Sequence, residues 1–309
     1  MIGSLKRLNI YFKEMYPIIP RLVLGFIVAM EIYFIVLLNQ GVVDFTFGIQ
    51  EIILGFTVFS FLCWLRIADD FKDYELDCRL FAHRPLPSGR VTKKDLRIFA
   101  AILIAFTVII NFIFMPKVHF IFCAILYTYG SLMAVWFFQK HKIQKSLPMA
   151  LVTHNPVQMI MNIYIISFVI IKYGLEIFTL HNAMAVFTLY FPALIWEVSR
   201  KIRAPKDETE YVTYSKLFGY KKAVNFVFIV TWMDIITNFI LVWNLSKISV
   251  VLLLLNILWI SWKFIEYKKD PTKYKIVDKV EKYTYIQESL MILTIVVSLL
   301  SSHFGFVII

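Results

Sequence analysis

Long apolar runs alternate with short polar loops along almost the whole chain. A helix of about 20 mostly apolar residues is enough to cross the hydrocarbon core of a bilayer. The runs reach that length and predict nine spanning helices, at residues 18–39, 50–72, 95–115, 118–139, 147–171, 181–200, 222–244, 247–266 and 286–308. The loops between them are too short for a soluble domain. We therefore expect an all-α, multi-spanning membrane protein with a single domain over residues 1–309.

The loops differ in charge in a regular way. Basic residues collect in every second loop, at the N-terminus and at 78–97, 140–145, 200–222 and 263–283. The only basic residues in the remaining loops are Lys117, Lys172 and Lys247. Because short basic loops tend to stay in the cytoplasm, the N-terminus and the basic loops are expected there. An odd number of spans then places the C-terminus on the opposite side.

The composition agrees with a membrane protein, and the placement of the basic residues argues against a nucleic-acid-binding protein. The chain is 60% hydrophobic and 17% charged, whereas soluble domains are about half apolar and about a quarter charged. The net charge of +11 could indicate a nucleic-acid partner, but the basic residues lie in short loops, where they set membrane topology. Cys63, Cys78 and Cys123 lack metal-ligand spacing and are expected to be free thiols. Residues 1–17 are predicted to form a basic amphipathic segment rather than a cleavable signal.

Four carboxylates mark the end of the second predicted span. The acids at four-residue steps, which fall along one face of a helix, are Asp69, Asp73 and Asp77. Asp70 lies beside this row, and Arg66 lies one turn before it. Like charges at this spacing repel, and a hard divalent cation such as Mg²⁺, which takes oxygen ligands and bridges carboxylates to phosphates, would compensate. The alternative is a solvated helix end in which Arg66 pairs with Asp70 and Lys72 with Asp73.

The segment after the acids, HRPLPSGR, cannot continue a helix because it contains prolines and a glycine. It places Arg84 and Arg90 in an ordered turn just beyond the carboxylates. The planar guanidinium of arginine suits bidentate binding of phosphate oxygens. Carboxylates for a metal, followed by a rigid basic turn, therefore favour a diphosphate ester as the ligand over a merely solvated helix end.

This combination resembles the first motif of the UbiA superfamily of intramembrane prenyltransferases. The run RPLPSGR at residues 84–90 is the most specific part of the resemblance. The chain departs from the usual form in a slightly shorter spacer before Arg84 and in Ala68, which stands where the family has asparagine. The resemblance implies nine helices around a central cavity with the acidic motifs at its cytoplasmic mouth. It also implies Mg²⁺-dependent transfer of an isoprenyl group from a prenyl diphosphate.

A second acidic segment follows the sixth predicted span. Glu197 lies deep in the helix end, three and four residues before Arg200 and Lys201. Ionisable groups inside a membrane usually line a functional cavity. The alternative is an ion pair between Glu197 and Lys201 at a helix end that reaches the lipid headgroups. Asp207 and Glu208 follow in the loop.

This segment resembles the second UbiA motif, an acid on helix six followed by an acidic loop and a close of the form S-x-L-F-G, here SKLFG at 215–219. The middle aspartate of that motif falls at Ala204 in this chain. Arg200, Lys201 and Arg203 make the helix end more basic than in the family. We therefore expect one metal ion at this site where relatives hold two, with the cations neutralising the rest of the diphosphate.

Weaker signals concern the acceptor. His154 and Asn155, with Gln158 and Asn162 on nearby turns, form a polar patch in the fifth predicted span and are candidates for binding the acceptor or accepting a proton. A lone intramembrane histidine is more often a core residue than a ligand. Tyr214, in the loop with the acids, is a candidate cover for the cavity. The other aromatic residues could stabilise a carbocation, but packing is their default role.

The predicted function is therefore that of a Mg²⁺-dependent intramembrane prenyltransferase. Its expected partners are an isoprenyl diphosphate, a hydrophobic or aromatic acceptor and the lipid bilayer, with no nucleic acid. The predicted catalytic acids are Asp69, Asp70, Asp73, Asp77 and Glu197. The predicted metal ligands are Asp69, Asp73, Asp77, Glu197, Asp207 and Glu208. The predicted substrate-binding residues are Arg66, Arg84, Arg90, Arg200, Lys201, Arg203, His154, Asn155 and Tyr214.

Two other functions stay open at this point. A UbiA-like terpene cyclase would use the same acids on the prenyl diphosphate alone, without an acceptor. A non-enzymatic transporter would use them as a cation site, but it would need no diphosphate and would leave the RPLPSGR turn without a purpose.

Overall fold

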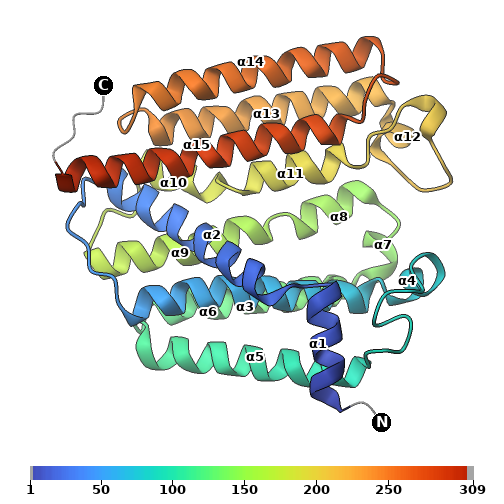
Figure 1. Cartoon of the computed structure of the whole chain (residues 1–309), viewed down its shortest axis with the longest axis horizontal. Helices are drawn as coiled ribbons and strands as arrows, with labels where there is room; N and C mark the ends of the chain where they lie inside the picture. The colour runs from blue at the N-terminus through green and yellow to red at the C-terminus, as the bar shows by residue number, and fades with distance from the viewer. Residues whose placement is uncertain (1–2, 305–309) are drawn as a thin grey trace. The chain divides into compact units, whose positions relative to one another are not determined.

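The computed structural model describes residues 3–304, and within them the chain consists of helices joined by turns and loops, with no strand (Figure 1). The α-helices are α1 Ser4–Glu14, α2 Ile18–Asn39, α3 Ile49–Lys72, α4 Tyr74–Leu80, α5 Lys93–Phe114, α6 His119–Ala134, α7 Lys140–Ile143, α8 Leu147–His154, α9 Val157–Tyr173, α10 Leu180–Phe187, α11 Tyr190–Ser199, α12 Tyr214–Phe218, α13 Tyr220–Val242, α14 Lys247–Lys269 and α15 Ile276–Phe304. Two short 3₁₀ helices are η1 Trp136–Phe138 and η2 Pro205–Asp207. The expected all-α fold is confirmed.

The chain divides into two compact units, and α2 contributes to both. The first unit comprises the chain up to Met30 together with Thr46–Lys140. The second comprises Glu31–Phe45 and the chain from His141 onward. The first acidic segment therefore belongs to the first unit, and the segment that begins at Glu197 belongs to the second.

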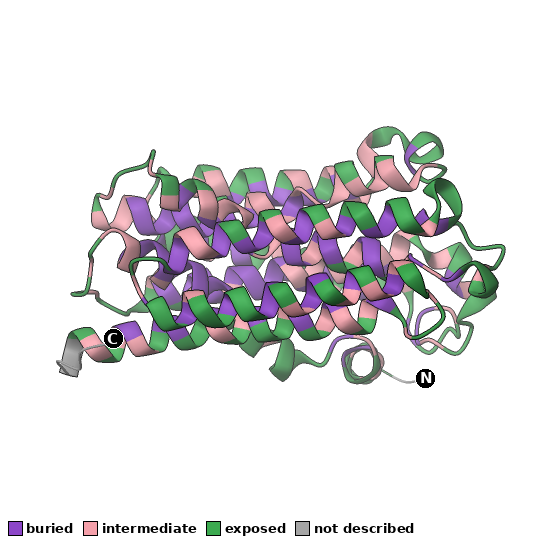
Figure 2. Cartoon of the chain, turned by 90° about the horizontal axis from the view of Figure 1, so that it is seen from above, coloured by how far each residue is buried: buried purple, intermediate pink, exposed green. Residues whose placement is uncertain are grey.

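In the first unit, α3 packs against α5 and α6. The inward face of α5 carries Leu96, Ala100 and Leu103, which recur at helical steps and are buried. Large apolar side chains cover its exposed face: Ile98, Ile102, Phe106, Ile109 and Ile113. Exposed and buried faces of this kind are visible on the helices in Figure 2. A helix that is apolar on both faces suits lipid on its outer side.

Close packing and hydroxyl groups hold the helices of the first unit together. At Gly25 of α2, an added Cβ would lie 2.8 Å from the backbone of Phe59 in α3, so the two helices approach where no side chain intervenes. Ser60 Oγ of α3 lies 2.7 Å from Thr107 Oγ1 of α5 and 3.0 Å from Tyr127 Oη of α6. These buried hydroxyls satisfy one another and join the three helices.

In the second unit, α13, α14 and α15 lie side by side, and α11 packs on α13 and α15 (Figure 1). Asp234 of α13 is fully buried. Tyr283 Oη and Gln287 Nε2 of α15 donate to its carboxylate at 2.9 and 3.2 Å, and Asn238 Nδ2 donates at 3.3 Å. Asp234 thus ties α13 to α15 through several hydrogen bonds, as a buried carboxylate requires.

Within residues 3–304, seven helical segments are long and apolar enough to cross a membrane: Ile18–Asn39, Ile49–Lys72, Lys93–Phe114, Leu147–Tyr173, Tyr220–Val242, Lys247–Lys269 and Ile276–Ser302. The predicted count of nine spans is therefore not exact. The fourth predicted span, 118–139, contains the shorter helix α6 and ends in η1. The sixth, 181–200, is broken into α10 and α11. The ninth begins earlier than 286, and its predicted end at 305–308 lies outside the described residues.

Asn162 of α9 accounts for the break between α10 and α11. Its Nδ2 donates to the backbone oxygens of Ala185 at 3.4 Å, of Val186 at 2.9 Å and of Thr188. The last carbonyls of α10 therefore find a donor on another helix, as helix ends require. The chain then turns at Leu189, whose φ of 64° lies in the left-handed region. A hydrophobic pattern cannot predict this break, because the donor lies in another helix.

Candidate active site

The first acidic segment spans the end of α3 and the whole of α4. Asp69 and Asp70 lie in the last turn of α3, Asp73 lies at the junction, and Asp77 lies in α4. The Asp73 N–H donates to the Asp69 carbonyl at 2.9 Å, and the Asp77 N–H donates to the Asp73 carbonyl at 2.8 Å. Backbone hydrogen bonds four residues apart therefore continue across the junction, although Asp73 itself has a non-helical ψ of 5° and separates α3 from α4.

Asp70 is the most enclosed carboxylate of the segment. It is 5% exposed. Arg66 Nη2 donates to its Oδ1 at 2.7 Å, and Tyr11 Oη donates to its Oδ2 at 2.6 Å. The Arg66–Asp70 pair belongs to the alternative interpretation, a helix end with local ion pairs, and it is present. Lys72 binds Asp69 at 3.2 Å instead of Asp73, which that interpretation paired it with.

Asp77 joins the acids to the basic turn. Arg84 Nη1 donates to both oxygens of the Asp77 carboxylate, at 2.9 and 2.8 Å. The turn is ordered, because the Ser88 N–H donates to the Arg84 carbonyl at 2.9 Å. Gly89 in the turn has a φ of 76°, which only glycine adopts freely. The predicted ordered turn after the carboxylates is therefore present.

Arg90, at the end of the turn, binds the N-terminal helix. Its Nη1 and Nη2 donate to Glu14 Oε1 and Oε2 at 2.5 and 2.9 Å. Nη2 also donates to the His83 carbonyl at 2.6 Å. This bidentate pair lowers the pKa of Glu14 below its usual range. The guanidinium of Arg90 thus binds a carboxylate with the geometry in which it would bind a phosphate.

Two of the acids, a basic side chain and the N-terminal helix meet around one small pocket. It is lined by Tyr11, Met15, Asp70, Asp77, Arg84, Leu86 and Pro87. The pocket is too narrow to hold a water molecule. Carboxylates and a guanidinium gathered at one place are the donor types that a divalent cation and a phosphate use, but Arg84 and Asp77 here bind each other.

The donor set of the first segment fits Mg²⁺. Partial loss of hydration and then the nearby carboxylate of Asp69 raise the pKa of Asp73, with smaller contributions from Asp77 and Asp70. A divalent cation would relieve the part of this shift that comes from repulsion between the carboxylates. Within the described residues, no three His, Cys, Asp or Glu side chains form a complete ligand cluster by themselves. Mg²⁺ suits such a site because it keeps waters and takes ligands from substrate phosphates.

The second acidic segment begins with an ion-pair cluster at the end of α11. Glu197 accepts from Arg200 Nε at 2.5 Å and from Lys201 Nζ at 2.8 Å. The Glu197–Lys201 pair of the alternative interpretation is therefore present, and Arg200 also binds Glu197. Arg203 instead donates from Nη1 to Thr209 Oγ1 at 2.8 Å, away from this cluster.

The loop that follows holds Glu208 in place. Thr213 Oγ1 and Ser215 Oγ donate to its carboxylate at 2.7 and 2.5 Å. Asp207, in contrast, is exposed. Ala204 is buried and accepts from the Asp207 N–H at 2.9 Å. An aspartate at position 204 would therefore need a partner or a cation to offset its burial.

The candidate acceptor residues lie at the end of α8, in the turn after it and in α9. His154 ends α8, where its Nδ1 lies 2.9 Å from Thr153 Oγ1 and 3.0 Å from the Ala150 carbonyl of its own helix. Asn155 lies in the turn between α8 and α9. Asn162 is fully buried and donates to backbone oxygens at the break between α10 and α11. Asn162 therefore has a structural role at the break, and His154 bonds within its own helix through Nδ1.

Tyr214 lines an apolar pocket formed by α8, α11, α12 and α13. Its hydroxyl donates to the Leu147 carbonyl at 3.3 Å, and burial raises its pKa to about 12. The pocket has a volume of about 380 Å³ and is lined by Pro148, Leu151, Val152, Val198, Tyr214, Phe218, Lys222, Ala223 and Phe226. Its apolar lining suits a hydrocarbon chain.

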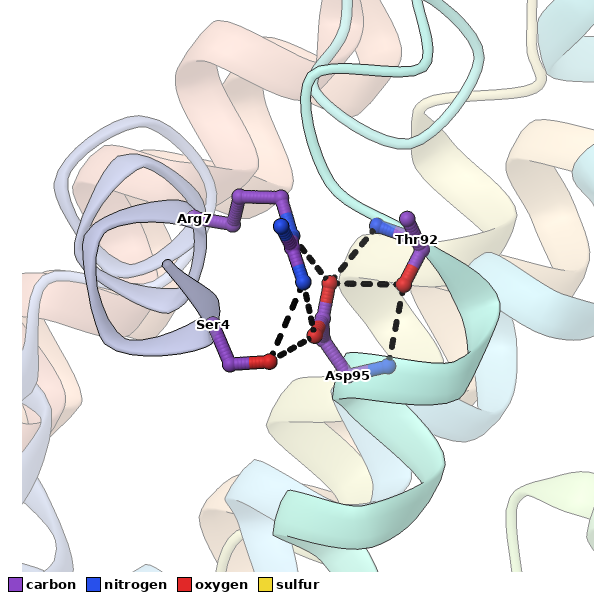
Figure 3. Close-up of polar contacts among 4 residues, drawn as sticks. All are labelled: Ser4, Arg7, Thr92 and Asp95. Atoms are coloured by element: carbon purple, nitrogen blue, oxygen red, sulfur yellow. Dashed lines mark hydrogen bonds and ion pairs between the residues drawn. The ribbon is translucent and has the colours of Figure 1, made fainter. Parts of the chain in front are cut away.

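The N-terminal helix is the part of the site that was not predicted. Ser4 and Arg7 of α1 and Thr92 converge on Asp95 at the start of α5 (Figure 3). Arg7 Nε and Nη2 donate to the two oxygens of Asp95 at 2.6 and 2.8 Å. Further along the same helix, Tyr11 donates to Asp70 and Glu14 accepts from Arg90. The amphipathic character of residues 1–17 was the one available sequence signal.

The fold and these sites define a class: helical membrane proteins with acidic and basic residues clustered at helix ends. The model of the UbiA prenyltransferase family matches residues 22–280, well over half of the chain, and the chain belongs to this family. It is accordingly an integral, multi-pass membrane protein.

The similarity to solved structures is one of fold. A structure from work on digeranylgeranylglyceryl phosphate synthase in membranes matches with a TM-score of 0.65 and 15% sequence identity. The match covers 95% of this chain and 99% of that chain. No curated protein matches the sequence significantly.

Proposed function

We propose that the protein transfers an isoprenyl group from a prenyl diphosphate to a hydrophobic or aromatic acceptor within the membrane, with Mg²⁺ as its cofactor. The observation that supports this most is the meeting of Asp70, Asp77 and Arg84 around one pocket of the first segment. Membership of a prenyltransferase family favours an enzyme over a cation transporter. The neighbour associated with digeranylgeranylglyceryl phosphate synthase makes a lipid-like acceptor worth testing.

In the first segment, Arg84 would exchange Asp77 for the oxygens of the diphosphate, since guanidinium binds both anions in the same geometry. Asp69, Asp73 and Asp77 are the candidate metal ligands. Arg66 would keep Asp70 oriented. When bound, Mg²⁺ would stabilise the negative charge of the diphosphate as it leaves. Arg90 would also bind the diphosphate if it is released from Glu14.

In the second segment, Glu197, Asp207 and Glu208 are the candidate metal ligands. Arg200, Lys201 and Arg203 are the candidate cations for the diphosphate. The hydroxyls of Thr213 and Ser215 fix Glu208, and a fixed carboxylate loses little entropy on binding a ligand.

The proposed reaction breaks the bond between the allylic carbon and the diphosphate oxygen. Both electrons of that bond go to the diphosphate, which leaves an allylic cation shielded from water by the helices. The acceptor then forms a new bond to this carbon and gives up a proton. His154, Asn155 and Tyr214 remain the candidates for binding the acceptor, and His154 is the candidate for taking the proton.

Topology is part of the proposal. The basic loops favour a cytoplasmic N-terminus and cytoplasmic acidic segments, where a water-soluble diphosphate headgroup would reach them. Labelling of single cysteines placed at exposed Asp207 or at Lys117 with a membrane-impermeant reagent tests this. Labelling of position 117 from the cytoplasmic side would contradict it.

The reaction is tested with purified protein in lipid nanodiscs, given prenyl diphosphates of increasing chain length and Mg²⁺. Release of diphosphate is measured with and without a panel of aromatic and lipid-like acceptors. Release that requires an acceptor and yields a prenylated product supports the proposal. Release without an acceptor, together with a hydrocarbon or terpene alcohol, identifies a cyclase instead. No release under any condition contradicts both.

A further inference from the structure

The N-terminal helix α1 contacts the first acidic segment through one face. Arg7, Tyr11 and Glu14 are spaced by four and three residues, so their side chains project from the same side of the helix. Their partners are Asp95 at the start of α5, Asp70 in α3 and Arg90 at the end of the basic turn. α1 precedes the segment matched by the family model, residues 22–280.

The three contacts differ in strength. Asp95 is 4% exposed and receives bonds from Arg7, Ser4 and Thr92, which makes this contact the anchor of the helix (Figure 3). Glu14 and Arg90 have exposed side chains, 43% and 42%, and a surface pair of this kind contributes little stability. Tyr11 is fully buried, and its ring packs edge-on against Phe12.

The bond from Tyr11 to Asp70 is the one that reaches the acids. The phenol donates to Oδ2 at 2.6 Å while Arg66 donates to Oδ1 at 2.7 Å, so each carboxylate oxygen has its own donor. A carboxylate held at both oxygens cannot rotate about its χ2 bond. Tyr11 and Asp70 also line the same pocket as Asp77 and Arg84. The Tyr11 hydroxyl is therefore placed to hold Asp70 in position where it lines the pocket beside Asp77 and Arg84.

We propose that Tyr11 is a positioning residue for the first acidic segment: its hydroxyl fixes Asp70 so that the segment binds a divalent metal diphosphate. This inference rests on the proposed function, because it assumes that the segment binds a metal diphosphate at all. It makes α1 part of the binding apparatus, with Asp95 as its anchor.

Tyr11→Phe tests the inference because it removes the hydroxyl and keeps the ring packing. Tyr16→Phe is the matched control, since Tyr16 is 5% exposed and packs in the same hydrophobic cluster. Binding of Mn²⁺ in the presence of inorganic diphosphate is measured by electron paramagnetic resonance, alongside thermal melting and prenyl diphosphate turnover. Tyr11→Phe is expected to weaken Mn²⁺ binding by about tenfold, the loss typical of one hydrogen bond to a charged group. Tyr16→Phe is expected to bind Mn²⁺ like the wild type.

Mn²⁺ binding by Tyr11→Phe within twofold of wild type would overturn the inference while leaving the proposed function intact. If the wild type itself binds no Mn²⁺ with diphosphate, the proposed function fails and the inference falls with it. Should Tyr11→Phe not fold, Asp95→Asn carries the test, because it weakens the anchor of α1 without touching Asp70. Weaker Mn²⁺ binding by Asp95→Asn supports the inference, and unchanged binding overturns it.

Discussion

Arg84 binds both oxygens of Asp77 through Nη1, and the pair joins the acidic helix end to the basic turn that follows it. Asp77 is nearly buried, with 8% of its side chain exposed, whereas 30% of Arg84 is exposed. The arginine therefore keeps part of its side chain exposed while it neutralises a nearly buried carboxylate. A diphosphate that binds Arg84 would release Asp77 to a metal at the same moment, so the two binding events are expected to be cooperative.

Asp73 offers the cleanest test of metal binding by the acidic row. Its side chain is exposed and makes no capping hydrogen bond, so Asp73→Ala is expected to leave the melting temperature close to that of the wild type. Loss of one oxygen ligand is expected to remove several kcal/mol of charge stabilisation, on the order of a hundredfold or more in turnover. Steady-state turnover is the measurement.

Glu75→Ala is the matched control for Asp73, because Glu75 is an exposed acid in the first turn of α4, which Asp73 precedes, but lies outside the four-residue steps. It is expected to keep wild-type turnover. Turnover of Asp73→Ala within about tenfold of wild type, a difference of about 1.4 kcal/mol, would argue against metal binding by this row.

The choice of cation gives a second test. Mg²⁺ and Mn²⁺ are expected to support turnover, while Ca²⁺ is expected to support it poorly, because Ca²⁺ prefers more ligands at longer distances than a phosphate-bridging site provides. Chelation followed by titration with each cation measures this in one preparation. Full turnover in excess chelator would contradict the metal mechanism. It would mean that the basic side chains alone neutralise the charge of the diphosphate.

The sequence predicted what depends on local spacing. Apolar run lengths located most of the spans. The i, i+4 spacing indicated the pairs Arg66–Asp70 and Glu197–Lys201, as the alternatives to ligand binding. The spacing of charges along the chain gave the wrong partner for Lys72, whose side chain also contacts an aromatic ring. Lys72 binds Asp69, and its Nζ lies 4.6 Å above the ring of Trp136, which arrives from a distant part of the chain.

Contacts between helices were beyond prediction for the same reason. Tyr11 reaches Asp70 and Asn162 reaches the end of α10 only after the helices have packed. No periodicity in either segment identifies the partner. The central cavity, the metal ligands and the substrate-binding residues stay predictions, with the local geometry of each acidic segment now defined.

Asn162 provides a prediction about stability. Asn162→Ala removes the donor for the last carbonyls of α10, and a buried acceptor left without its partner costs about 1–3 kcal/mol. We expect a lower melting temperature in detergent. Gln158→Ala, on the preceding turn of the same helix and only partly buried, is the control and is expected to melt near the wild type. Equal melting of both variants would mean that the break does not depend on Asn162.

The basic end of α11 provides the last prediction. Ala204 stands where the family motif has an aspartate, so the second segment has fewer oxygens for metal, and the charge of the leaving diphosphate must be neutralised in another way. Arg200 and Lys201 both contact Glu197, at 2.5 and 2.8 Å, and are therefore held beside the acid of this segment. Arg203 turns to Thr209 and is the weaker candidate.

Arg200→Ala and Lys201→Ala are expected to raise the apparent KM for the prenyl diphosphate and to lower kcat, because each cation would act in both the bound and the transition state. The alternative is that these cations only pair with Glu197 or anchor α11 at the lipid headgroups. That alternative predicts a change in melting temperature with kinetics near wild type. Lys206→Ala, an exposed cation of the same loop, serves as the control for general loss of positive charge. Normal KM and kcat in both variants, with Lys206→Ala equally normal, would show that no cation replaces the missing acid.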